Sequence, residues 1–199
     1  MRVALFGGTF DPPHRGHVGI AQAAADAFEL DRVLFAPAGR QPLKTEVRPA
    51  DFADRLAMVK LACMEDTRFS ASEIDAPRAD GAPNFTVDTL AALKEAMPDA
   101  EIFSLIGADS LLGLRHWREP DRLLELAEWI VASRPGFPLG DLAAMGFSGE
   151  QRARIHLMET VHCDVAATEL RRRLREGDNC SDMLLPEVVN YIGAHHVYA

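Results

Sequence analysis

Apolar and polar positions along the chain follow two patterns that alternate. Short apolar runs predict buried β-strands. These strand candidates are Val3–Phe6, Val33–Phe35, a short one around Phe69, Ile102–Ile106 and Trp129–Ala132. Between the runs, apolar residues recur at three- and four-residue spacing, which is typical of amphipathic helices. Strands that alternate with helices predict right-handed βαβ units and a mainly parallel sheet.

The helices are placed by their apolar spacing and by their first residues. Val18, Ala21, Ala25 and Phe28 recur at helical spacing after the first strand, in a helix that begins near His14. Further helices are expected after Asp51, which suits an N-cap, from about Thr86 to Met97, and through most of the chain after Thr168.

The expected fold is α/β: a Rossmann-like, mainly parallel sheet with helices on both faces and a small helical C-terminal part. The 199 residues suit one domain, and we assign residues 1–199 to it. In such sheets ligands bind beyond the carboxyl ends of the strands. The loops that follow strands are therefore the candidate sites, and they span residues 7–17, 39–44, 107–109 and 134–136.

Composition narrows the class of protein. The formal net charge of −9 disfavours broad nucleic-acid binding, which needs a positive face. No apolar run approaches the roughly 18 residues of a membrane helix, and MRVALFGG reaches glycine too early for a signal-peptide core. Cys63, Cys163 and Cys180 are odd in number and show no paired spacing, so they are expected to be buried or free thiols. We therefore expect a cytoplasmic protein without membrane or nucleic-acid partners, and the sequence leaves its oligomeric state open, a homo-oligomer included.

The segment GGTFDPPHRGH, directly after the first strand, is the most informative part of the sequence. Gly7 and Gly8 allow a sharp turn and close approach of the backbone to a ligand. His14 and His17 share a face of the first helical turn, whose free N–H groups and positive dipole end would face the strand termini. Two imidazoles at a helix N-terminus suit a polyphosphate. The spacing alone leaves two alternatives open: a metal site, which would lack a third ligand nearby, and a purely structural turn.

This segment resembles the GGxFxPxHxGH signature of the nucleotidyltransferase superfamily. The resemblance implies that ATP is a co-substrate and that His14 and His17 are catalytic, contacting its phosphates and stabilising charge as the α-phosphate is attacked. It also implies that the loop itself binds ATP, through Gly7, Gly8, Thr9 and Phe10.

Later segments are similar to bacterial nicotinate-nucleotide adenylyltransferases. They are Pro42-Leu43-Lys44, the NFTVDTL segment at 84–90, the IGAD segment at 106–109, His116-Trp117 and Arg134-Pro135-Gly136. The resemblance implies an ATP-binding role for Gly107, Asp109 and Arg134. It implies that the acceptor is bound by Lys44, Thr86, Trp117 and Phe85, the last standing where the family usually has tyrosine.

Each of these residues also has an ordinary structural alternative. Asp109 could accept hydrogen bonds from ribose hydroxyls, or it could be the N-cap of a helix over 110–114. Trp117 could stack on a pyridine ring or belong to the core. Thr86 could hold a carboxylate at a helix start or simply cap that helix. Lys44 and Arg134 are candidate phosphate partners or solvated charges.

The segment DVAATELR at 164–171 resembles the family's ISSTxIR motif, which implies that Thr168 and Arg171 bind ATP and that Arg171 is catalytic. Alanine at 166 and 167 replaces both serines, so two hydroxyl donors are missing. With Thr168 as N-cap, Arg171 would lie at N3, where a cation opposes the helix dipole unless a polyanion binds there. Residues 164–199 are accordingly expected to form a phosphate-binding helical segment, with the other arginines of the helix on a solvated face.

The implied reaction is direct, in-line attack by nicotinate mononucleotide on the α-phosphorus of ATP, as a step of NAD biosynthesis. No Gly-x-Ser-x-Gly elbow or activated cysteine is present in the sequence, so catalysis would rest on positioning and charge stabilisation. Mg²⁺ is expected on the ATP phosphates without a dedicated protein site. Two alternatives remain: the same chemistry on nicotinamide mononucleotide, and a nucleotide-binding regulator that has lost catalysis.

Overall fold

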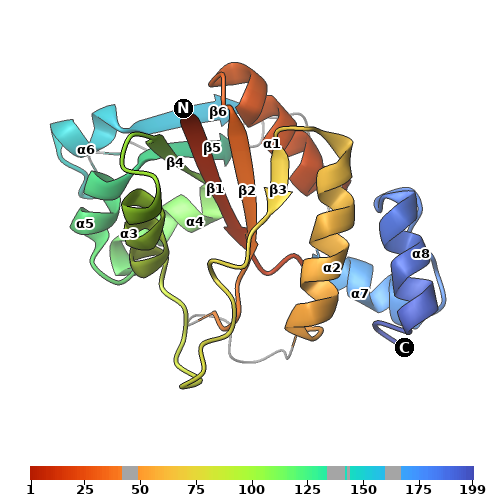
Figure 1. The fold of residues 1–199 in the computed structure, drawn as a ribbon. Helices are drawn as coiled ribbons and strands as arrows, with labels where there is room; N and C mark the ends of the chain where they lie inside the picture. Colours follow the sequence, from red (N-terminus) through yellow and green to blue (C-terminus); the bar gives the residue numbers. More distant parts are fainter. Residues whose placement is uncertain (42–48, 134–141, 143, 160–166) are drawn as a thin grey trace.

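A six-stranded parallel sheet forms the centre of the computed structural model, which describes residues 1–41, 49–133, 142, 144–159 and 167–199 (Figure 1). The strand order is β3-β2-β1-β4-β5-β6, and every described pairing is parallel. The strands are β1 (Arg2–Gly8), β2 (Arg32–Pro37), β3 (Phe69–Ala71), β4 (Glu101–Gly107), β5 (Glu128–Ser133) and β6 (Ile155–Glu159). The α/β prediction is thus confirmed, as are all five predicted strands.

The sixth strand, β6, is not predicted by the sequence pattern. Among the described strands it pairs with β5 alone, at the edge of the sheet. Ile155 and Met158 are buried, whereas Leu157 is 48% exposed. Ile155 packs in the apolar cluster on one face of the sheet and Met158 in the cluster on the other, while the positions beside them are exposed or half-buried. The strand therefore shows no continuous apolar run, and its sequence signal is weak.

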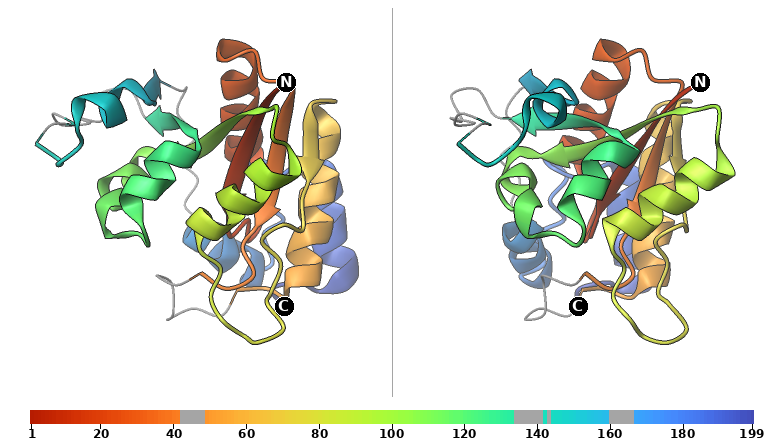
Figure 2. Two further views of the ribbon diagram at one scale, coloured as in Figure 1. Left: turned by 60° about the vertical axis from the view of Figure 1, so that its left-hand side comes forward. Right: turned by 90° about the vertical axis from the view of Figure 1, so that its left-hand side faces the viewer.

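Helices cover both faces of the sheet (Figures 1 and 2). One face packs against α1 (Arg15–Ala27), α2 (Phe52–Ala62), α7 (Ala167–Arg175) and α8 (Pro186–His195). The other face packs against α3 (Thr86–Ala96), α4 (Ala108–Leu112) and α5 (Pro120–Leu126). The short helix α6 (Gly149–Ala153) precedes β6, and 3-10 turns lie at Cys63–Glu65 and Leu114–His116. The predicted first residues are confirmed for α1, α2 and α3, with His14 and Asp51 at the N-cap positions of the first two.

Two apolar clusters follow from the alternation of side chains along the buried strands. Phe6 and Phe35 point to the face that carries α1 and α2, and Leu5 and Leu34 point to the opposite face. Because the strands are covered on both sides, almost every position in them is apolar. This arrangement leaves the carboxyl ends of the strands as the place for polar chemistry.

The C-terminal helices belong to the first of these clusters. Leu170 of α7 and Val188 of α8 are buried with residues of α1 and α2. Cys63 and Cys180 are free and buried, as expected, whereas Cys163 lies outside the described residues. No helix in the described part of the chain is long and apolar enough to cross a membrane.

Candidate active site

The candidate site begins where β1 and β4 end side by side. These strands pair from Arg2 with Glu101 to Phe6 with Leu105, and the strand order reverses between them. A Cβ atom built on Gly7 or Gly107 would meet no described protein atom within 4 Å. The two strand ends therefore leave room for a ligand to approach the backbone at the switch point, where ligands bind in open parallel sheets.

Phe10 belongs to this loop, and its side chain packs in the core. Its side chain is 2% exposed, and its ring lies 5.4 Å from the Phe6 ring, 5.0 Å from that of His17 and 5.6 Å from that of Phe35. The backbone adopts the left-handed conformation, with φ of 49°. The ring is therefore part of the core, and any contact of Phe10 with a ligand is left to its backbone.

His14 and His17 stack at the start of α1. Their ring centroids are 3.7 Å apart, and the backbone N–H of His14 donates to Nδ1 of His17 at 3.2 Å. Because Nδ1 of His17 is an acceptor, its neutral ring carries the proton on Nε2. Nδ1 of His14 is buried and has no hydrogen-bond partner among the described residues, and neither has Oγ1 of Thr9 in the same loop. Buried polar groups without partners are rare in folded proteins, so these two atoms suggest a ligand.

Burial also sets the charge of His14. The residue is 7% exposed, and this desolvation lowers the pKa of His14 from 6.5 to about 4. At neutral pH the ring is uncharged, so His14 offers a hydrogen bond rather than a full positive charge.

The N-terminus of α1 is less open than the sequence suggests. The N–H of Arg15 donates to the carbonyl of Met183 at 2.9 Å, and the N–H of His17 donates to the carbonyl of His14. The expectation of free N–H groups along the first turn is therefore wrong for Arg15. The C-terminal part occupies this donor, which could not be foreseen from local spacing.

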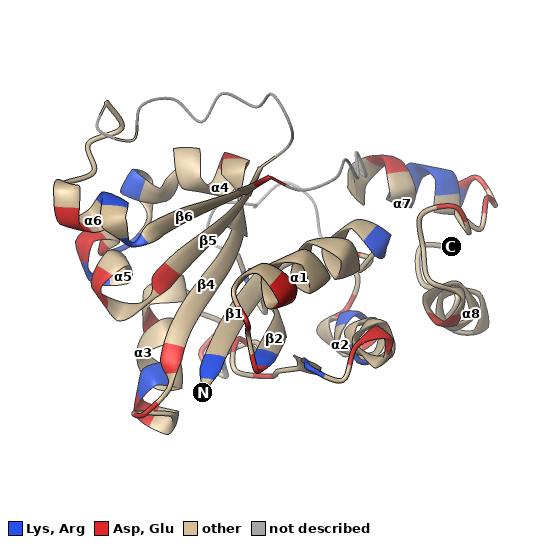
Figure 3. Ribbon diagram, turned by 90° about the horizontal axis from the view of Figure 1, so that it is seen from above, with Lys and Arg blue, Asp and Glu red and all other residues tan. Residues whose placement is uncertain are grey.

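Arg171 reaches the first loop from α7. Its Nη1 donates to the carbonyl of Asp11 at 2.9 Å and lies 3.5 Å from the Asp11 carboxylate, and its Nη2 donates to Oγ1 of Thr168. The predicted N-cap role of Thr168 is wrong, because Ala167 is already helical. The neighbouring Arg172 and Arg173 pair with carboxylates of the C-terminal part, as expected of a solvated face. Figure 3 shows basic and acidic positions close together along α7.

Two of the predicted acceptor residues, Phe85 and Thr86, lie at the start of α3. Phe85 is the N-cap and Thr86 the first helical residue, so Thr86 does not serve as the cap. The guanidinium of Arg118 lies 4.7 Å from the centre of the Phe85 ring. Trp117 is half-buried and contacts Trp129 edge to face at 6.4 Å, so it packs against the core, and its stacking on a pyridine ring stays a prediction. Arg118, which sequence reasoning missed, therefore contacts Phe85 and follows Trp117 directly in the chain.

Hydrogen bonds connect the segment before α3 to the loop that follows β2. The side chain of Asn84 accepts from the N–H of Arg40 and donates to the carbonyl of Ala76. The carboxylate of Asp75 accepts from Oγ1 of Thr89 at 2.8 Å, and burial raises the pKa of Asp75. A Cβ on Gly39 would lie 2.4 Å from the backbone of Pro77, so this close approach requires glycine.

Asp109 lies in the first turn of α4 and is exposed. The N-cap of this helix is Gly107, so the alternative of Asp109 as N-cap is wrong. No described side chain forms a hydrogen bond or ion pair with its carboxylate, which leaves it available to a ligand. Two other predicted residues, Lys44 and Arg134, lie outside the described residues, as does Ala166.

Sequence reasoning missed three residues around the first loop. Asp11 and Arg55 are 3% and 1% exposed, and Tyr198 donates to Asp11 at 2.7 Å. Arg55 had a sequence signal, since it lies on the apolar face of its helix with Phe52, Leu56 and Val59. Tyr198, far away at the C-terminus, had none.

Metal ligands are not grouped in the described residues: no three histidine, cysteine or carboxylate side chains there could hold an ion together. A pocket of about 350 Å³ lies at the C-terminus, next to Tyr198, and none of the described predicted site residues lines it. The features that could bind a nucleotide are the strand ends, the two histidines and Arg171.

Comparison with known proteins gives a consistent result. The cytidylyltransferase-like family model matches residues 5–173. The protein of Rubrobacter xylanophilus named probable nicotinate-nucleotide adenylyltransferase is 42% identical over 197 residues, covering 96% of this chain and 89% of its own. That of Thermus thermophilus, with the same name, is 37% identical over 198 residues and covers 100% of both chains.

Solved structures agree on the fold. Nicotinic acid mononucleotide adenylyltransferase of Plasmodium falciparum, complexed with NaAD, is 15% identical and superposes with a TM-score of 0.75, covering 99% of this chain and 97% of its own. Its complex with APC gives 0.73, covering 99% and 96%. Identity this low shows the fold alone, but the relatives above share more than a third of their residues over nearly the whole length. The chain belongs to the nicotinate-nucleotide adenylyltransferase family.

Proposed function

We propose that this chain transfers the AMP moiety of ATP to nicotinate mononucleotide, forming nicotinate adenine dinucleotide and pyrophosphate in NAD biosynthesis. The observation that carries the proposal is the buried, unpartnered Nδ1 of His14, stacked on His17 at the end of β1. Family membership supports the choice of acceptor.

ATP would lie across the ends of β1 and β4. The backbone of the first loop, with Oγ1 of Thr9, would contact the phosphates, and the exposed carboxylate of Asp109 would accept from the ribose hydroxyls. The full proposed ATP-binding set is Gly7, Gly8, Thr9, Phe10, His14, His17, Gly107, Asp109, Arg134, Thr168 and Arg171.

Nicotinate mononucleotide would bind near the start of α3. The backbone N–H groups of Thr86 and Val87, which donate to no described residue, favour a carboxylate, and the faces of Trp117 and Phe85 favour a flat ring. Arg118, which lies over Phe85, adds a positive charge next to them. Lys44 completes the proposed acceptor set with Phe85, Thr86 and Trp117.

The reaction needs no covalent intermediate on the protein. An oxygen of the 5′-phosphate of nicotinate mononucleotide attacks the α-phosphorus of ATP, the new P–O bond forms, and the bond to the β-phosphate oxygen breaks with release of pyrophosphate. His14 and His17 donate hydrogen bonds to the phosphate oxygens, and Arg171 supplies the positive charge. Mg²⁺, carried by the ATP phosphates, would neutralise part of their charge, because the described residues offer no cluster to hold it.

We also infer that residues 1–199 act as one nucleotidyltransferase domain, with 164–199 contributing to phosphate binding. The free thiols of Cys63 and Cys180 support a reducing compartment, which is the cytoplasm. A homo-oligomer is compatible with this role.

The test is pyrophosphate release from ATP and Mg²⁺ with three acceptors in parallel: nicotinate mononucleotide, its amide, and phosphopantetheine. We expect a strong preference for nicotinate mononucleotide that is lost in His17→Ala. Comparable rates with the amide would refute the acceptor, and tight ATP binding without pyrophosphate release would point to a nucleotide-binding regulator.

A further inference from the structure

We propose that Tyr198 is a positioning residue for Arg171, and that it acts through the buried carboxylate of Asp11. The segment that carries Tyr198 then helps to hold the proposed catalytic residue Arg171 in place. This inference rests on the proposed function, because it assigns to Arg171 a contact with the ATP phosphates.

Asp11 joins three distant segments. Its Oδ1 accepts from Oη of Tyr198 at 2.7 Å and from the N–H of Ala50 at 3.2 Å. Its Oδ2 lies 3.5 Å from Nη1 of Arg171, which also donates to the Asp11 carbonyl. The side chain of Asp11 is almost completely buried, so water does not replace a lost partner easily.

Arg55 also lies beside Asp11, and its described hydrogen bonds do not involve Arg171. It donates from Nε to the carbonyl of Ala50 and from Nη1 to that of Thr9. The loop and the start of α2 are therefore held by Arg55 even when Tyr198 is changed. What Tyr198 adds is one hydrogen bond to the carboxylate that faces Arg171.

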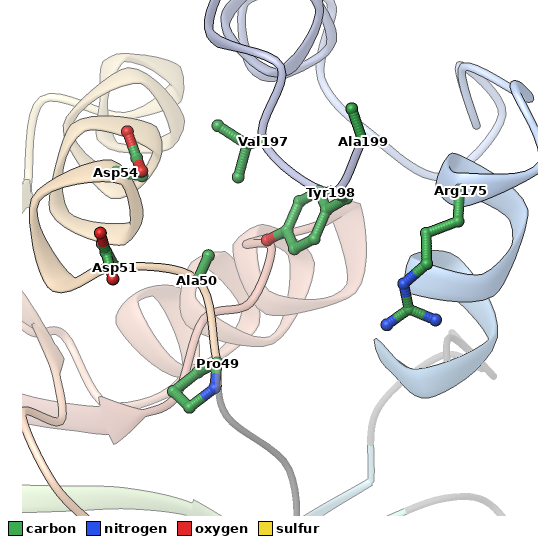
Figure 4. Close-up of a pocket in the computed structure, with 8 residues that line it drawn as sticks. All are labelled: Pro49, Ala50, Asp51, Asp54, Arg175, Val197, Tyr198 and Ala199. Carbon is green, nitrogen blue, oxygen red and sulfur yellow. The ribbon is translucent and has the colours of Figure 1, made fainter.

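The backbone of Tyr198 indicates a functional constraint. Its φ is 90°, a left-handed conformation that is strained for a bulky side chain. Figure 4 shows its ring between Ala50 and Arg175, with the hydroxyl on the side of Ala50. Burial and the charge of Asp11 raise the pKa of the Tyr198 phenol, so it remains a donor at working pH.

Loss of the Tyr198 hydroxyl changes the electrostatic interaction between Asp11 and Arg171. Without the phenol, the N–H of Ala50 at 3.2 Å is the one hydrogen-bond donor left to Oδ1 of Asp11 among the described residues. The buried carboxylate then interacts more strongly with the guanidinium of Arg171, 3.5 Å from Oδ2, and draws it toward the loop. An arginine held this way binds the phosphates less well as charge develops in the transition state.

The experiment compares Tyr198→Phe with a matched control, Tyr191→Phe. Tyr191 also donates its hydroxyl to a carboxylate, that of Asp54 at 2.9 Å, but between α8 and α2 and away from Arg171. We expect Tyr198→Phe to lower kcat about tenfold, with the KM for nicotinate mononucleotide unchanged, and Tyr191→Phe to leave both unchanged. The midpoint of thermal unfolding should fall further in Tyr198→Phe, because water replaces the lost hydrogen bond less easily at the buried Asp11 than at Asp54.

A double-mutant cycle tests whether the effect passes through Arg171. In an Arg171→Ala background, Tyr198→Phe should change kcat by less than about twofold, because the residue to be positioned is gone. A full tenfold loss in that background would overturn the inference. So would an active wild type whose Tyr198→Phe and Tyr191→Phe variants turn over equally, while the proposed function would stand. A wild type that is inactive with all three acceptors would refute the proposed function and this inference with it.

Discussion

Replacing His14 by asparagine should flatten the dependence of stability on pH below neutrality. In the folded protein, burial lowers the pKa of His14 from 6.5 to about 4, because the protonated ring would lie in a desolvated site. The unfolded chain therefore binds more protons than the native one between about pH 6.5 and pH 4. Stability rises with pH through that window and is lost as the pH falls.

The size of the effect follows from the two pKa values. Integration of the linkage relation from pH 7 down to pH 5 gives a loss of about 2 kcal/mol from His14 alone. Below pH 4 the loss reaches about 3 kcal/mol, since each pKa unit corresponds to about 1.4 kcal/mol. Asparagine keeps a polar group at the position but has no proton to gain.

The assay is urea unfolding of wild type and His14→Asn, followed by circular dichroism at pH 7 and pH 5. The difference between the two proteins isolates His14, because the other titrating groups are common to both. The wild type should lose about 2 kcal/mol more than the variant between the two values. A difference below about 0.5 kcal/mol, or one of opposite sign, would show that His14 is not desolvated as the structure indicates.

Two further predictions concern residues whose surroundings differ sharply. Asp109→Ala should raise the KM for ATP about tenfold while changing the free energy of unfolding by less than about 1 kcal/mol. The reason is that the carboxylate is exposed and forms no hydrogen bond or ion pair with the described residues. Initial-rate and urea measurements check this, and an unchanged KM would contradict the ribose role. Burial raises the pKa of the Cys63 thiol to about 12 and also raises that of Cys180, so at pH 8 native protein should react rapidly with a disulfide reagent at no more than one of its three thiols. All three should react after denaturation, and rapid reaction of two in the native state would refute the burial of these thiols.

Local pattern predicted the parts of the fold that are locally encoded. The apolar runs of β1, β2, β4 and β5 are buried on both faces, and the first loop carries its own turn and helix-start residues. The edge strand β6 was not predicted because only two of its five residues, Ile155 and Met158, are buried, so it has no continuous apolar run. The cap at Thr168 was misjudged because helix ends are set by neighbouring structure as much as by the first polar residue.

The sequence by itself determined the class of fold and the family and supplied the residues proposed for the site, because strand and helix periods and the GGTFDPPHRGH segment are short-range properties. Only the tertiary structure decided how these residues behave. The neutral state of His14 depends on burial. The N–H of Arg15 donates to the carbonyl of Met183, and Arg171 and Tyr198 both form hydrogen bonds with Asp11. Each of these contacts joins segments far apart in the chain. Desolvation and long-range hydrogen bonds arise only when the packed chain brings such groups together.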